Sequence, residues 1–176
     1  MDTSHFSFHF PTRAFTLIEL IVVIAIIGLL SSMILASVNS AREKARDARR
    51  FADMRQIQLA LELYYDDHNR YPATSSSNGS WEESYEDGGA FIEVLVDERY
   101  LPTYIVDPIN DTSKRYAYYR YGPGSGGCST SNGAFYVLGV RDMETSGRPH
   151  PDSPGWSCPT RNWQGEFDWV VGKFEG

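Results

Sequence analysis

The stretch Arg13–Leu30, RAFTLIELIVVIAIIGLL, decides the fold. Every residue from Leu20 to Leu30 is apolar or Gly. From Phe15 to Val38 the chain runs for 24 residues with one charged side chain, Glu19. As a helix this segment would be about 36 Å long, enough to cross the hydrocarbon of a bilayer. A carboxylate inside such a span is costly without a partner, so Glu19 needs an explanation.

Three kinds of segment fit this composition: a bitopic anchor, an ordinary cleaved signal peptide, and a segment that uses Glu19. As a signal peptide, the chain would be cut before Ala41, after the weak small-residue site Val38-Asn39-Ser40. As an anchor, the basic residues after the span would leave the rest of the chain in the cytoplasm by the positive-inside rule. Neither of these two explains the carboxylate.

Helix-forming residues continue beyond the apolar run. Residues 41 to 65 are rich in Ala, Arg, Glu, Leu and Gln. Apolar side chains recur there every three or four residues, at Phe51, Met54, Ile57, Leu61 and Tyr64. Polar side chains take the opposite positions, at Arg49, Asp53, Gln56 and Glu62. The helix should stop within Asp66–Pro72, where Asn69 can form a left-handed cap and Pro72 cannot continue a helix. We expect one helix from about residue 15 to 67, whose second half is amphipathic.

Charge is spread unevenly along this chain of 176 residues and net charge -7. Residues 39 to 56 carry six basic and three acidic side chains, whereas residues 57 to 176 carry nine basic and eighteen acidic ones. The six basic residues are Arg42, Lys44, Arg46, Arg49, Arg50 and Arg55. They form either a solvated helix face or a site attracted to anionic lipids or acidic neighbours. The acidic remainder argues against a nucleic-acid partner.

The remainder of the chain predicts a small antiparallel sheet. Residues 73 to 90 form a polar loop, and residues 90 to 101 (AFIEVLVDERYL) predict a short helix. Three strands follow, at residues 115–121, 134–140 and 168–174, separated by Gly- and Ser-rich segments. We expect the eleven Tyr and four Trp to fill the core and to pair across strands. The fold class is therefore α+β, with a long N-terminal helix packed on a small sheet.

No motif for catalysis is found in the sequence. The patterns GxSxG, HExxH and the P-loop are missing, and after residue 15 the only histidines are His68 and His150. We therefore expect that the protein is not an enzyme. Its two cysteines, Cys128 and Cys158, should form a disulfide if this region lies outside the cytoplasm; two buried free thiols are the alternative.

The residues around Glu19 resemble a known processing signal. The run from Ala14 to Glu19, AFTLIE, followed by apolar residues, is similar to the class III signal of type IV prepilins and of type II secretion pseudopilins. In that family a membrane peptidase cuts before the Phe and methylates the new amine. The resemblance implies cleavage between Ala14 and Phe15 and N-methylation of Phe15, although Gly is more usual at the position of Ala14.

The same resemblance explains Glu19. Cleavage would create an amine at Phe15, one helical turn before the carboxylate, and an acid near a helix N-terminus is favoured by the macrodipole. In the family the matching Glu neutralises the amine of a neighbouring subunit during filament growth. Glu19 is therefore expected to be an assembly residue.

Other segments extend the resemblance. LALELYYDDHNRYP is similar to the end of the long helix in major pseudopilins, and the loop of residues 142–164 resembles a pilin loop that is often held by a disulfide. Many members have a Pro about twenty residues after the cut, which kinks or melts the helix. This chain has Ala36 near that place, so the family's melted segment is not carried over to it. The implied segments are a leader (1–14), a membrane and filament-core helix (15–38), its amphipathic continuation (39–68) and a globular head (69–176).

The resemblance implies a structural subunit of a type IV pilus-like filament. The alternatives are a major pseudopilin of a type II secretion system and, from another class, a secreted soluble binding module with an ordinary signal peptide. The implied partners are other copies of the chain, minor pilins, a prepilin peptidase, an assembly ATPase and a platform protein. The implied location is the cytoplasmic membrane as a single-pass protein with its head outside, and then a cell-surface or periplasmic filament.

Calcium is the one cofactor that the resemblance raises, because major pseudopilins hold Ca²⁺ in a late acidic loop. The oxygen ligands that this chain offers are Asp107, Asn110, Asp111 and Asp142. Neither the segment that contains Asp107, Asn110 and Asp111 nor the segment that contains Asp142 matches the family's calcium loop closely. The alternative role for these residues is to cap turns. No cofactor is therefore expected, with these residues as the candidate ligands.

Overall fold

The computed structural model describes residues 15–75 and 80–176. The chain divides into two units, Met1–Ala41 and Arg42–Gly176, which are described separately. Helix α1 (Leu17–His68) contributes to both. The predicted leader, residues 1–14, lies outside the described residues.

In the first unit, α1 carries the apolar run. Every side chain from residue 15 to residue 41 is exposed. Among the described residues, α1 is the one helix long and apolar enough to cross a membrane. Burial inside the chain therefore does not stabilise this part of the helix, and a nonpolar environment has to come from outside it.

In the second unit, α1 ends as predicted. Asn69 adopts the left-handed conformation with a φ of 54°, and its N–H donates to the carbonyl of Tyr65 at 2.7 Å. Asn tolerates this conformation better than most residues. The cap at Asn69 is thus confirmed.

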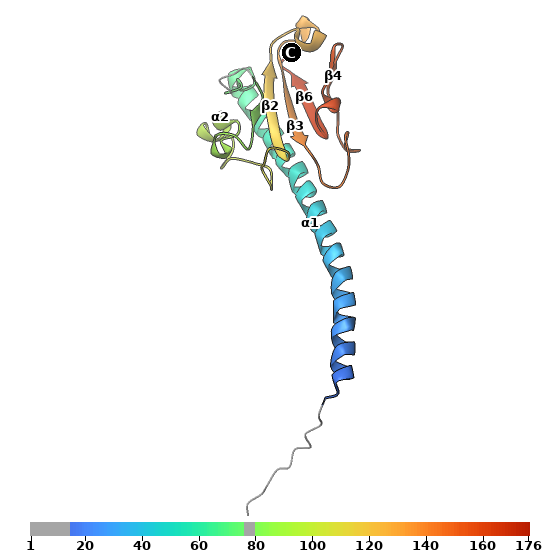
Figure 1. Ribbon diagram of the computed structural model, residues 1–176. Coiled ribbons are helices and arrows are strands. Elements are labelled where there is room, and N and C mark those ends of the chain that lie inside the picture. Colours follow the sequence, from blue (N-terminus) through green and yellow to red (C-terminus); the bar gives the residue numbers. More distant parts are fainter. Residues whose placement is uncertain (1–14, 76–79) are drawn as a thin grey trace, which may run out of the picture. The chain divides into compact units, whose positions relative to one another are not determined.

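The second unit is built on a four-stranded antiparallel sheet of order β1-β2-β3-β6 (Figure 1). The three predicted strands are confirmed to within one residue as β2 (Arg115–Tyr121), β3 (Phe135–Arg141) and β6 (Trp169–Phe174). The two-residue strand β1 (Glu82–Glu83) lies in the predicted polar loop. A second small sheet pairs β4 (Ser157–Cys158) with β5 (Arg161–Asn162).

One face of the sheet packs on α1. Side chains of β2 and β3 alternate in direction, so every second residue enters the same core. This core includes Tyr116, Tyr118, Tyr136, Leu138 and Val140 from the sheet and Met54, Ile57, Leu61 and Tyr64 from the helix. The predicted amphipathic face and the packing role of the Tyr residues are confirmed.

The other face of the sheet is covered as well. Ala117, Phe135, Val137 and Val170 face a second core with Trp163 and Phe167, from the segment between β3 and β6. Phe167 lies so close to Gly139 that a Cβ there would come within 2.5 Å of its ring. This second core was not predicted, because its covering segment has the Gly- and Pro-rich composition of a surface loop.

The predicted helix at residues 90–101 is wrong in extent. Helix α2 covers only Glu93–Asp97. Ile92 before it and Arg99 after it have φ values of 47° and 69°, which an α-helix cannot contain. Phe91 and Leu95 are nevertheless buried, so the apolar side chains that favoured a helix do enter the core.

Candidate functional site

The predicted assembly residue lies in the first turn of α1. Glu19 accepts hydrogen bonds at one carboxylate oxygen from the backbone N–H and the hydroxyl of Thr16, at 2.9 and 2.7 Å. The N–H of Glu19 donates in return to the Thr16 hydroxyl at 3.3 Å. This reciprocal pattern is a capping box, which satisfies two backbone donors at the start of a helix.

The capping box gives Glu19 a partner within its own chain. Phe15, the residue predicted to carry the new amine, precedes the helix and is 81% exposed. Ala14, the other half of the predicted cleavage site, lies outside the described residues. Thr16 was not singled out from the sequence, although the Thr-x-x-Glu spacing before an apolar run is a known signal for this cap.

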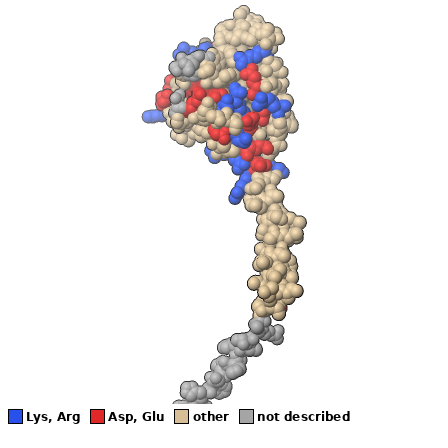
Figure 2. Space-filling model, in the orientation of Figure 1, with Lys and Arg blue, Asp and Glu red and all other residues tan. Residues whose placement is uncertain are grey.

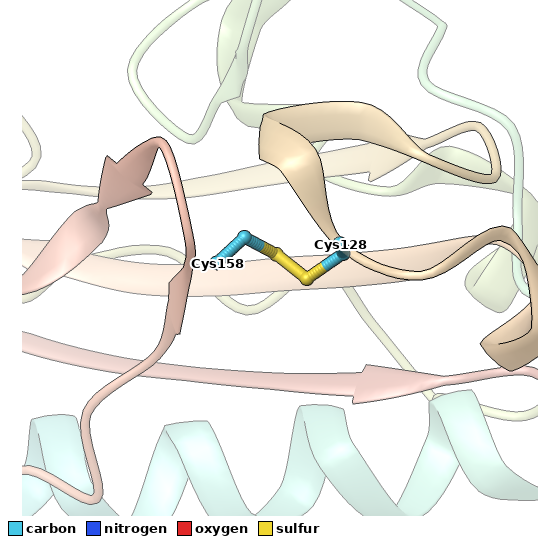
Figure 3. Close-up of a disulfide and its surroundings, with 2 residues drawn as sticks. All are labelled: Cys128 and Cys158. Atoms are coloured by element: carbon cyan, nitrogen blue, oxygen red, sulfur yellow. A yellow bond between two sulfur atoms is a disulfide. The ribbon is translucent and has the colours of Figure 1, made fainter.

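The structure joins Cys128 and Cys158 in a disulfide with a Cα–Cα distance of 5.0 Å. Cys158 belongs to β4 and Cys128 follows the turn after β2 (Figure 3). The bond therefore ties the segment that covers the outer face of the sheet to the connection between β2 and β3. Cys158 is itself part of the second core.

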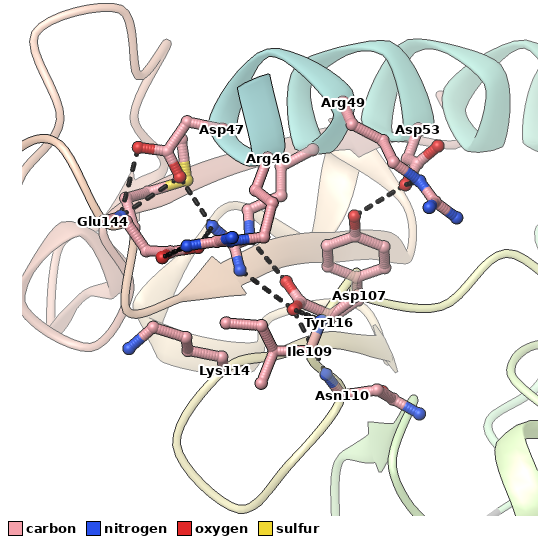
Figure 4. Close-up of polar contacts among 12 residues, drawn as sticks. Arg46, Asp47, Arg49, Asp53, Asp107, Ile109, Asn110, Lys114, Tyr116 and Glu144 are labelled. Carbon is pink, nitrogen blue, oxygen red and sulfur yellow. Dashed lines mark hydrogen bonds and ion pairs between the residues drawn. The ribbon is translucent and has the colours of Figure 1, made fainter. Parts of the chain in front are cut away.

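A buried cluster of charged groups lies where α1 meets the head (Figure 4). Arg50 of α1 is 0% exposed. Its Nε and Nη2 donate to the two oxygens of Asp107 at 2.6 and 3.0 Å. Its Nη1 donates to Asp47 at 2.6 Å and to Glu144 at 2.8 Å. A single guanidinium thus contacts three carboxylates.

A second cation completes the cluster. Arg46 binds both oxygens of Glu144, with its Nε at 2.7 Å from one of them. Asp47 accepts the backbone N–H groups of Glu144 at 3.1 Å and of Thr145 at 2.8 Å. We name Arg46, Asp47, Arg50, Asp107 and Glu144 the Arg50 cluster. It fixes two loops of the head on α1.

Hydrogen bonding decides the ionisation of the carboxylates in the cluster. Burial acts to raise the pKa of Asp47, but hydrogen bonds from Thr145, Glu144 and Arg50 together lower it. The pKa of Glu144 is lowered mainly by its hydrogen bond from Arg46, which exceeds the opposing effect of burial, and Arg50 lowers it further. Both groups are therefore held as carboxylates.

For Arg50, the cluster corrects both interpretations of the basic stretch. Arg50 neither belongs to a solvated face nor can reach lipid, because it is buried. Arg49 is exposed and lies 3.6 Å from Asp53, while Arg42, Lys44 and Arg55 are exposed. The signal for Arg50 was its position, four residues before Met54 and seven before Ile57, on the apolar face of the helix.

Each of the four calcium candidates already has a hydrogen-bond or ion-pair partner within the chain. The carboxylate of Asp107 is held by Arg50, and Asp111 accepts the backbone N–H groups of Ser113 and Lys114 at 2.8 and 2.7 Å. The side chain of Asn110 bonds Ser84, and Asp142 lies 3.6 Å from Arg148. In the described parts of the chain, no three Asp, Glu, His or Cys side chains are placed to hold a metal.

Comparisons with known proteins agree with the N-terminal geometry. The family described as the prokaryotic N-terminal methylation motif matches residues 11–35. The type II secretion system core protein G of Pectobacterium carotovorum is 40% identical over 62 residues, which is 35% of this chain and 40% of that protein. The same-named protein of Aeromonas hydrophila is 34% identical over 84 residues, 43% and 59% of the two chains.

The core protein G of Escherichia coli K12 is 38% identical over 63 residues, 36% of this chain and 43% of that protein. The chain thus spans about half the length of the curated relatives that it matches. No solved structure matches it.

Proposed function

Since the chain belongs to the pilin and pseudopilin family, we propose that it is a pseudopilin, a structural subunit of the filament of a type II secretion system. The observation that carries this proposal is the methylation motif at residues 11–35, which precedes a helix with Glu19 in its first turn. The sequence alone favoured a type IV pilus. The named relatives favour the secretion system, so the pilus interpretation is kept only at the level of the family.

The first unit supports assembly as the mechanism. Its helix is apolar all round and exposed from residue 15 to residue 41, so it needs either lipid or other copies of itself around it. Moving from lipid into a bundle of such helices keeps the apolar surface away from water. The cost of Glu19 falls if its carboxylate pairs with the amine of Phe15 from a neighbouring copy.

The proposal includes partners and a location. Other copies of the chain and minor pseudopilins would form the filament, a prepilin peptidase would process Phe15, and an ATPase with a platform protein would drive assembly. Before assembly the chain would cross the cytoplasmic membrane once, with its head outside. A disulfide between Cys128 and Cys158 is consistent with a head in an oxidising compartment.

The first experiment is to coexpress the chain with a prepilin peptidase and to determine the mass and N-terminal sequence of the product. We expect a chain that begins at N-methyl-Phe15. A start near Ala41 would instead identify a secreted soluble module. An uncut chain, in the presence of a peptidase that cuts a control prepilin, would contradict the proposal.

The second experiment distinguishes the two kinds of filament. The chain is expressed in a secretion-competent strain that lacks its core protein G, and secretion of a reporter exoprotein is measured. Restored secretion is expected. A processed chain that restores surface pili in a pilin-deficient strain but does not restore secretion would return the assignment to a type IV pilus.

A further inference from the structure

The Arg50 cluster brings together three carboxylates from distant parts of the chain. Asp47 comes from α1, Asp107 from the loop before β2, and Glu144 from the segment after β3. Their side chains are 4%, 0% and 8% exposed. Three carboxylates withdrawn from water need cationic partners, because an uncompensated buried charge is strongly destabilising.

Metal ions commonly gather carboxylates in this way. Here Arg46 and Arg50 supply two positive charges, the same charge as one calcium ion. Against three carboxylates, either arrangement leaves one net negative charge. The guanidinium of Arg50 also binds several carboxylates at once, as a metal ion does. It binds Asp107 through two parallel hydrogen bonds.

The oxygens of these carboxylates face hydrogen-bond donors. Both oxygens of Asp107 accept from Arg50, and one of them also accepts the N–H of Ile109 at 2.8 Å. Those of Asp47 accept from Arg50, from the backbone of Glu144 and from Thr145. A metal ligand would need oxygen lone pairs that are free of such donors. A calcium ion, which the family resemblance raised as a candidate, therefore does not fit these residues.

We propose that Arg50, assisted by Arg46, takes the place of a divalent cation in this head. The guanidinium is the internal cation that holds the loops around Asp107 and Glu144 on helix α1. The head then needs no calcium to keep these loops in position, whatever filament it builds.

The first test measures thermal unfolding of the full chain in detergent, with a calcium chelator, with added calcium, and with neither. The melting temperature should be the same in all three conditions, and direct titration should show no stoichiometric calcium binding. A melting temperature that falls on chelation, or one calcium bound per chain, would overturn the proposal.

The second test compares Arg50→Met with Arg49→Met, the exposed neighbour that makes one long ion pair. We expect Arg50→Met to lower the melting temperature by about 10 °C or more, since it leaves Asp47 and Asp107 without a cationic partner and Glu144 with Arg46 alone. Arg49→Met should lower it by about 2 °C or less. Equal effects of the two substitutions would contradict a special role for Arg50. If Arg50→Met does not accumulate, Arg50→Lys replaces it: this variant keeps the charge without the guanidinium fork, and it should lower the melting temperature more than Arg49→Met does.

The third test separates a cation's role from mere packing by its pH dependence. In Arg50→Met the stranded carboxylates should gain protons on mild acidification, so its melting temperature should rise between pH 7 and pH about 5. The melting temperature of the wild type should not rise over that range. Parallel pH profiles of the two proteins would show that Arg50 acts only by filling space, and would overturn the proposal.

Discussion

The two halves of α1 have the same secondary structure and different means of support. From Leu17 to Ala41 every side chain is exposed, whereas from Arg42 to His68 one face enters the core of the head. The space-filling view shows the second unit with positive and negative side chains interspersed over its visible face (Figure 2). A helix without partners in its own chain can exchange lipid for other subunits. A helix that forms part of a core cannot leave it without unfolding the head.

The largest effect on assembly should come from the one charged side chain in the first half of α1. Glu19→Gln removes the charge that would neutralise the amine of Phe15 in another copy. A charge-assisted pair contributes roughly 1.5–3 kcal/mol, so filament yield should fall by about tenfold or more. Sheared filaments are quantified after coexpression with the assembly machinery. Cleavage at Phe15 should continue, and Glu19→Asp is the control that keeps the charge. Normal filament yield from Glu19→Gln would remove the assembly role of this residue.

The buried and exposed faces of the second half of α1 should contribute differently to stability, and two Leu residues allow this difference to be measured. Leu61 is 0% exposed and Leu59, two positions earlier on the same helix, is 62% exposed. Leu61→Ala should reduce the free energy of unfolding by about 2–5 kcal/mol, through lost burial and a cavity. Leu59→Ala should change it by about 0.5 kcal/mol or less in the isolated subunit. Denaturant unfolding in detergent gives both values, and similar losses would mean that the helix packs differently on the sheet.

The disulfide should stabilise the head and leave the first half of α1 unaffected. Replacing Cys128 and Cys158 together by Ser should reduce the free energy of unfolding by roughly 2–4 kcal/mol. Adding a reductant to the wild type should reproduce this loss, and adding it to the double variant should change nothing. A variant as stable as the oxidised wild type would show that the outer core holds its covering segment without the bond.

Composition and periodicity were enough to predict α1 and the three longer strands. The first half of α1 is a continuous apolar run, its second half repeats apolar side chains every three to four residues, and β-branched and aromatic residues dominate the strands. The capping box of Thr16 and Glu19 was not predicted, although its Thr-x-x-Glu spacing is a local signal in the sequence. These features depend on neighbours in the sequence, and local preference and tertiary packing agree in them.

The Arg50 cluster and the outer core depend on distant residues. Arg50 and Asp107 are 57 positions apart, and Arg50 and Glu144 are 94 apart. Nothing local to Glu144 indicates which cation it will bind. The sequence analysis therefore placed Arg50 in a basic stretch and did not use its position on the apolar face, which was a signal for burial. In a similar way, the segment that supplies Trp163 and Phe167 has the composition of a loop, and only its tertiary contacts reveal a core.

The smallest expected effect is the pH dependence of the stability that Asp47 and Glu144 contribute where the second half of α1 meets the head. The pKa values of Asp47 and Glu144 are lowered in the folded head from ordinary values of 3.8 and 4.5. The stability that these groups contribute is therefore fully present above those values and is lost as pH falls through the folded pKa values. Burial raises the pKa of Glu82 and of Asp53, and these groups act in the opposite sense.

Glu144→Gln isolates one of these contributions. At neutral pH the variant should be less stable than the wild type by about 1–2 kcal/mol, because it loses a charged partner of Arg46 and Arg50. As pH falls below 4.5 the wild type loses the same contribution, so the two curves of unfolding free energy against pH should converge. A constant difference at every pH would mean that Glu144 acts through its shape. Convergence would show that charge holds this loop on the second half of α1.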